Sequence, residues 1–194
     1  MKKDIILAGV GGQGILSIAA IIGYAAMESG YQLKQAEVHG MSQRGGDVQS
    51  HLRISDKSIH SDLIPQGGAD LIISVEPMEA LRYKSYLADS GWMITNTTAF
   101  KNIPNYPQET DLMNEVKNIS NNIAINADQI AKDIGANRSM NMVILGAAAD
   151  YLDIDYDKLE AGIKFVFGRK GEKIVEANLA AMRAGREAAK ANND

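Results

Sequence analysis

The stretch DIILAGVGGQGILSIAA, residues 4–20, constrains the fold of this chain more than any other segment. It opens with an apolar run, residues 5–8, that is typical of a parallel strand buried on both faces. Apolar residues then recur at helical spacing over residues 15–26, and Gly30 is the expected end of that helix. The glycines between strand and helix are Gly9, Gly11 and Gly14. A strand, a glycine turn and a helix in this order predict the start of a layered α/β fold.

The remaining segments alternate between strand-like and helix-like patterns. Further strands are expected at Gln32 to Val38, Asp47 to Ile54, Ala69 to Val75, Trp92 to Asn96 and Ile123 to Asn126. One helix is expected from Pro77 to about Leu87, and the pattern is helical again from about Arg138 to about Ala191. The stretch from Thr97 to Asn122 gives the least definite pattern. We expect residues 1–194 to form a single domain with a Rossmann-like α/β fold, a mostly parallel sheet and a helical C-terminal third.

Composition excludes several classes of protein. The 194 residues carry a formal net charge of −4, which indicates no basic surface for nucleic acid. No apolar run reaches the roughly 18 residues that a membrane span needs. Because cysteine is absent, the chain can form neither a disulfide nor a cysteine-ligated iron–sulfur cluster. His39, His51 and His60 share no helical face and no carboxylate cluster, so we expect no metal site. We expect a soluble, cytoplasmic protein.

The glycine turn has two interpretations. In a nucleotide-binding turn of the form G-x-G-x-x-G, Gly9 permits the tight turn, Gly11 lets the backbone approach a phosphate, and Gly14 allows close packing. The N–H groups and dipole at the start of the following helix attract an anion. Glu37, at the end of the second expected strand, is where an NAD site places the acid that binds the ribose. In the alternative interpretation, the glycines only let the helix pack on the strand.

A second candidate segment, AEVHGMSQRGGDVQSH at residues 36–51, follows the second expected strand. Ser42, Gln43 and Arg44 are hydrogen-bond donors, and Gly45 and Gly46 allow backbone N–H groups to face an anion. The planar guanidinium of an arginine suits a phosphate. A solvated turn explains the same composition equally well.

Glu76 and Glu79 flank the start of the helix expected at Pro77. Paired carboxylates can serve acid–base chemistry, but a glutamate at a helix start is favoured by the helix dipole alone. Nothing else in the chain completes a reaction site, so we assign no catalytic residue.

Five blocks in order carry a family resemblance. They are GVGGQGI, AEVHGMSQRGGDVQSHLRI, LIPQGGADLIISVEPMEALRY, NMVILGA and EANLAAMRAG. Together they resemble the gamma-type domain of 2-oxoacid:ferredoxin oxidoreductases, and the form EVHGMSQRGG is most similar to the beta subunit of indolepyruvate:ferredoxin oxidoreductase. The resemblance covers roughly residues 4–95 and 137–185 and thins between 97 and 122.

The resemblance implies a subunit of an enzyme that oxidatively decarboxylates a 2-oxoacid to an acyl-CoA while reducing ferredoxin. It places thiamine diphosphate and the iron–sulfur clusters on a larger partner subunit, and it makes coenzyme A a possible ligand of this chain. The isolated chain is a possible homo-oligomer. The implied contacts with phosphate or partner subunit lie in the two glycine-rich segments, at Gly9, Gly11, Gly12, Gln13, Gly14, Ser42, Gln43, Arg44, Gly45 and Gly46. Asn178 and Gly185 share a face of the last helix, which serves either packing or a partner contact.

Three functions therefore remain open. A subunit that helps to bind coenzyme A accounts for all five blocks. A non-catalytic assembly scaffold with an empty glycine turn is the second. A free-standing NAD-dependent dehydrogenase accounts only for the glycines and Glu37.

Overall fold

The computed structural model describes residues 1–39 and 45–192. Its centre is a six-stranded sheet with the strand order β2-β3-β1-β4-β5-β6. The strands are β1 Lys2–Val10, β2 Gln32–His39, β3 Asp47–Ser55, β4 Ala69–Ser74, β5 Leu87–Asn96 and β6 Asn122–Ile125. Strands β1, β4, β5 and β6 pair in parallel, whereas β3 is antiparallel to both β1 and β2. The expected α/β fold with a mostly parallel sheet is confirmed.

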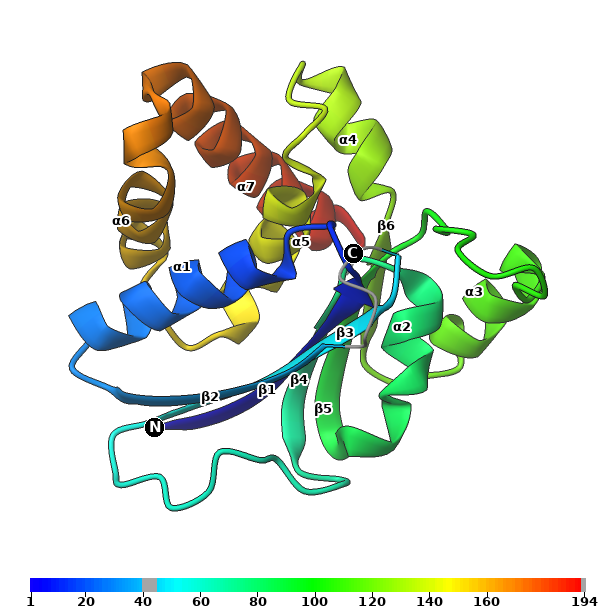
Figure 1. Cartoon of the computed structure of the whole chain (residues 1–194), viewed down its shortest axis with the longest axis horizontal. Helices are drawn as coiled ribbons and strands as arrows, with labels where there is room; N and C mark the ends of the chain where they lie inside the picture. Colours follow the sequence, from blue (N-terminus) through cyan, green and yellow to red (C-terminus); the bar gives the residue numbers. More distant parts are fainter. Residues whose placement is uncertain (40–44, 193–194) are drawn as a thin grey trace.

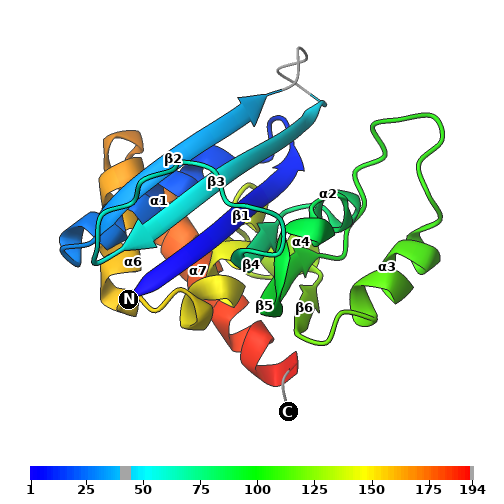
Figure 2. The same ribbon diagram turned by 90° about the horizontal axis from the view of Figure 1, so that it is seen from below.

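Helices cover the two faces of the sheet unequally (Figure 1). They are α1 Ile15–Glu28, α2 Pro77–Arg82, α3 Glu109–Lys117, α4 Ala127–Asp133, α5 Met140–Ala148, α6 Tyr156–Phe167 and α7 Glu172–Asn192. On one face α1 packs with α6, and α5 packs with α7, over the larger apolar core. On the other face α2 and a smaller core lie beside α3. The view from below in Figure 2 shows β2 and β3 at one edge of the sheet, away from α2 and α3.

The apolar run in β1 follows from its position between these two cores. Ile5 and Leu7 point into the larger core, and Ile6 and Ala8 point into the smaller one. A strand that is covered on both faces needs an apolar side chain at every position.

Two glycines let α5 and α7 cross in close contact. A Cβ atom added to Gly146 would lie 1.9 Å from the carbonyl oxygen of Met182, and one added to Gly185 would lie 1.9 Å from that of Val143. The packing interpretation of Gly185 is therefore confirmed. None of the helices in the described residues combines the length and apolar character required to cross a lipid bilayer.

The structure corrects two expected boundaries. Helix α2 ends at Arg82 rather than near Leu87, because a 3-10 turn at Lys84–Tyr86 leads directly into β5. Leu87 pairs with Ala69 of β4, so it belongs to the sheet. The helical part of the chain begins earlier than Arg138, because α4 starts at Ala127, where the Asn126 side chain accepts a hydrogen bond from the backbone N–H of Gln129. Within the least definite stretch, α3 has two carboxylates in its first turn, which favour a helix start.

Candidate functional site

The candidate site lies where β1 and β4 end side by side. After β1 the chain enters α1 on the face of the larger core, and after β4 it enters α2 on the opposite face. The crevice outside two parallel strands whose connections diverge in this way is where open α/β sheets bind ligands. The glycine turn, Gly45 and Gly46 of the second glycine-rich segment, and Glu76 lie at this edge.

The turn between β1 and α1 differs in detail from the roles expected for its glycines. Gly12 and Gly14 have positive φ angles of 100° and 85°, so they form the turn. Gly9 also provides close packing, since an added Cβ would lie 2.4 Å from Cγ2 of Val75, and the expected close packing at Gly14 is confirmed, because a Cβ there would lie 2.5 Å from the amide nitrogen of Asn141. The side chain of Gln13 closes the turn by accepting a hydrogen bond from the backbone N–H of Val10 at 2.9 Å. Within residues 1–39 and 45–192, no side-chain hydrogen bond caps the start of α1 at Gly14, and an uncapped helix start offers backbone N–H groups to an anion.

The two glycine-rich segments meet through their backbones. The N–H of Gly11 donates to the carbonyl of Gly46 at 2.8 Å, and the N–H of Gly45 donates to the carbonyl of Gly11 at 3.3 Å. These bonds lie directly beyond the last pair of the β1–β3 ladder, Val10 and Asp47. The N–H of Gly11 is therefore used within the protein, and a phosphate would have to bind at Gly12 to Gly14. Ser42, Gln43 and Arg44 lie outside the described residues, so their roles stay predictions.

A cleft of about 640 Å³ opens beside Gly12 and Gly14. Its lining comes from the glycine turn, the segment before α5, the 3-10 turn at Gly168–Lys170 and the first turns of α7. Arg138 and Lys170 contribute positive charge, and none of the described residues that line the cleft is acidic. Helix α5 also starts here, and the side chain of the residue that precedes it at the N-cap position, Ser139, makes no capping hydrogen bond. Two uncapped helix starts and two cations make this cleft favourable for an anion.

Two asparagines fix the wall of the cleft. The side-chain amide of Asn141 donates to the carbonyl of Gly14 at 3.1 Å, which ties α5 to the glycine turn. The side-chain amide of Asn178 donates to the carbonyl of Ile174 at 2.7 Å within α7. Sequence reasoning missed Arg138 and Lys170 as site residues, and the only signal for them was the position of Arg138 three residues before the NMVILGA block.

Glu76 and Glu79 both have structural partners. Glu76 is fully buried and caps α2 by accepting the backbone N–H of Glu79 at 2.9 Å. Glu79 accepts two hydrogen bonds from the guanidinium of Arg82, yet burial raises the pKa of its carboxyl, and neighbouring Asp47 raises that pKa further. Burial and the hydrogen bond to Asp47 also raise the pKa of the Tyr83 hydroxyl. The helix-start interpretation of both glutamates is confirmed.

Glu37 does not occupy the position that an NAD site requires. In a dinucleotide-binding fold, the ribose-binding acid ends the strand next to β1. Here β3 lies between β1 and β2, and Glu37 on β2 pairs with Ser50 of β3. The side-chain amide of Gln35 donates to the Glu37 carboxylate. A full strand therefore separates Glu37 from the glycine turn.

The mixed sheet with β3 inserted beside β1, the glycine turn and the cationic cleft define a Rossmann-like α/β fold that differs from a dinucleotide-binding dehydrogenase domain. The sequence matches the family model described as pyruvate ferredoxin/flavodoxin oxidoreductase over residues 4–188, and the chain belongs to this family. The resemblance to 2-oxoacid:ferredoxin oxidoreductases is confirmed.

Relatives and solved structures agree with this family. Indolepyruvate oxidoreductase subunit IorB from Archaeoglobus fulgidus is 37% identical over 196 residues, which cover 95% of this chain and 94% of the relative. The gamma subunit of a keto/oxoacid ferredoxin oxidoreductase from Geobacter sulfurreducens PCA has a TM-score of 0.72 at 25% identity, and the match covers 97% of this chain and 99% of that subunit. The 2-oxoglutarate:ferredoxin oxidoreductase from Magnetococcus marinus shares the fold, with a TM-score of 0.78 at 24% identity. That match covers 98% of this chain and 31% of the longer chain from Magnetococcus marinus.

Proposed function

We propose that this chain is a subunit of an indolepyruvate:ferredoxin oxidoreductase and that it contributes to coenzyme A binding and to subunit assembly. The complex oxidatively decarboxylates an aryl 2-oxoacid, transfers the acyl group to the thiol of coenzyme A and passes the electrons to ferredoxin in the cytoplasm. A larger partner subunit carries thiamine diphosphate and the iron–sulfur clusters. The likeness to subunit IorB supports this assignment, and the absence of cysteine agrees with clusters held elsewhere.

The observation that carries the coenzyme A role is the cleft beside Gly12 to Gly14. Coenzyme A is polyanionic through its diphosphate and its ribose phosphate, and the cleft combines two uncapped helix starts with Arg138 and Lys170. The solved structure from Magnetococcus marinus contains coenzyme A, which supports coenzyme A as the ligand class for this fold.

The experiment compares neighbouring cations in the complex with the large subunit. Arg138→Gln and Lys170→Gln remove charge from the cleft, whereas Arg169→Gln removes an exposed charge from the residue next to Lys170 that does not line it. Loss of a hydrogen bond to a charged group is worth about 1.5 to 3 kcal/mol, so the KM for coenzyme A should rise by about tenfold or more in the first two variants. Arg169→Gln should match wild type. If all three variants have the same KM for coenzyme A, the cleft is not the coenzyme A site.

A second candidate function is assembly alone. It is favoured by the use of the Gly11 backbone within the protein and by exposed Leu16 and Ile174, which lie at the first turns of α1 and α7. Under this proposal, the three variants retain wild-type KM values, and Leu16→Ser reduces co-purification of the large subunit.

A further inference from the structure

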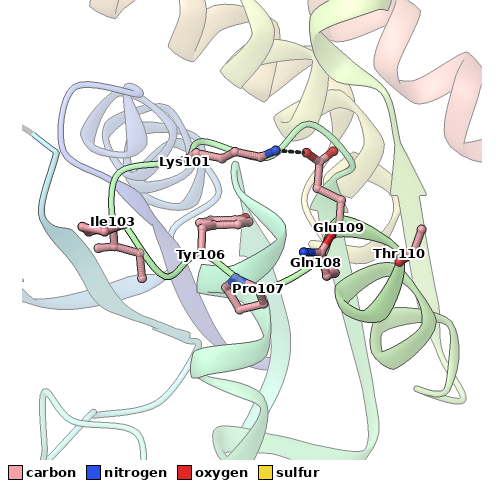
Figure 3. A pocket seen from close by; sticks show the side chains of 8 residues that line it. Lys101, Ile103, Tyr106, Pro107, Gln108, Glu109 and Thr110 are labelled. Carbon is pink, nitrogen blue, oxygen red and sulfur yellow. Dashed lines mark ion pairs between the residues drawn. The ribbon is translucent and has the colours of Figure 1, made fainter.

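Residues 97–108 cross the carboxyl edge of the sheet without forming a helix or a strand. Their apolar anchoring is weak, because Phe100 and Ile103 are 45% and 38% exposed. A pocket of about 380 Å³ lies along the later part of the segment, and an ion pair between Lys101 and Glu109 spans it at 2.7 Å (Figure 3). Polar contacts must therefore hold much of this segment in place.

Glu76 supplies two of these contacts. One carboxylate oxygen, Oε2, caps α2, and one oxygen is sufficient for a helix cap. The other oxygen, Oε1, accepts the backbone N–H of Phe100 at 3.2 Å and the hydroxyl of Tyr106. The carboxylate is fully buried, so each of these donors compensates for its lost hydration.

Between the two points held by Glu76, the segment reaches the second glycine-rich loop. The side-chain amide of Asn102 donates to the carbonyl of Gly45 at 2.8 Å. Gly45 and Gly46 in turn form both backbone hydrogen bonds with Gly11. A continuous chain of contacts therefore connects Glu76 to the glycine turn.

We propose that Glu76 is a positioning residue, which holds residues 97–108 so that Asn102 fixes the Gly45–Gly46 backbone against Gly11. Helix capping accounts for one carboxylate oxygen, and this role accounts for the other. The consequence for coenzyme A rests on the proposed function, because the glycine turn borders the cleft.

The test removes single contacts along this path in the full-length chain. Tyr106→Phe deletes only the hydroxyl that reaches Glu76 and leaves the cap of α2 intact. Asn102→Ala cuts the path at Gly45 and serves as the second variant if Tyr106→Phe fails to fold. Thr98→Val is the control, since it deletes a hydroxyl of the same segment that donates to Asn126 at 3.3 Å instead.

Amide hydrogen exchange at Gly11 and Gly45 reports on the positioning directly. We expect exchange at both amides to rise about tenfold in Tyr106→Phe and Asn102→Ala, and to stay at the wild-type rate in Thr98→Val. Unchanged exchange at Gly11 and Gly45 in both test variants would overturn the proposal, as would an equal rise in the control.

The KM for coenzyme A in the assembled complex separates this proposal from the proposed function. A raised KM at unchanged kcat in Tyr106→Phe supports the consequence for the cleft. Faster exchange with wild-type KM in both Tyr106→Phe and Arg138→Gln upholds the positioning role and refutes the coenzyme A site. Faster exchange with a raised KM only in Arg138→Gln refutes the consequence of positioning for the cleft.

Discussion

The close crossing of α5 and α7 predicts a large, non-additive loss of stability when its glycines gain a methyl group. In Gly146→Ala the new Cβ would lie 1.9 Å from the carbonyl oxygen of Met182, whereas ordinary van der Waals contacts begin at 3.4 Å. The two helices would have to separate by about 1.5 Å, the difference between these distances. A gap of ~0.5–1 Å already removes a quarter to a half of the contact energy between packed atoms.

The magnitude follows from two opposing effects. Overpacking a core costs typically about 1–3 kcal/mol, and occasionally more. A glycine replaced by alanine inside a helix regains roughly 0.5–1 kcal/mol. The obstruction here is backbone on an opposing helix and cannot rotate away, so we expect Gly146→Ala to lose about 2–3 kcal/mol of unfolding free energy. The measurement is urea unfolding followed by circular dichroism.

The reciprocal glycine makes the reasoning sharper. Gly185→Ala clashes with the carbonyl of Val143 at the same crossing, so a single separation of the helices relieves both clashes. The double variant should therefore lose clearly less stability than the sum of the single variants. Gly168→Ala is the control, because an added Cβ there meets no atom within 4 Å. Wild-type stability in Gly146→Ala, or strict additivity in the double variant, would refute the close crossing.

Three further predictions concern pH, activity and the second glycine-rich loop. Nδ1 of buried His51 accepts a hydrogen bond from the backbone N–H of Ile64, and burial together with the charge of Arg53 lowers the pKa of His51. The contribution of neutral His51 to the free energy of unfolding should therefore be complete above the ordinary pKa of about 6.5 and be lost as the pH falls through the lower folded-state pKa. Urea titrations at several pH values should show a smaller loss of stability at acid pH in His51→Gln than in wild type. The isolated chain supplied with thiamine diphosphate should neither decarboxylate 2-oxoacids nor reduce viologen dyes, and measurable turnover would contradict the subunit assignment. In the complex, Arg44→Lys should either raise the KM for coenzyme A or reduce co-purification of the large subunit, because lysine loses the planar donor fork, and wild-type values of both quantities would contradict a role for Arg44.

Local patterns predicted most of the fold because they report burial directly. The apolar run of β1 and the helical spacing of α1 each reflect the cores that cover them, so both elements lie where they were expected. The predicted end of α2 was wrong because Tyr83 and Leu87 continue an apolar pattern that fits a helix. In the structure, Tyr83 donates a hydrogen bond to Asp47 and Leu87 pairs with Ala69, and both contacts are long-range. Such contacts leave no periodic signal in the sequence.

The candidate site was only half predictable for the same reason. The glycine turn is local, and its position between β1 and α1 could be read from seven residues of sequence. Arg138 and Lys170 join it only through tertiary packing, because Asn141 ties α5 to the carbonyl of Gly14 and α7 packs against α5. An added Cβ on Gly14 would lie 2.5 Å from the amide nitrogen of Asn141. Gly14 therefore serves two purposes: its positive φ turns the chain into α1, and its missing side chain admits α5, which follows directly after Arg138 and Ser139 in the lining of the cleft.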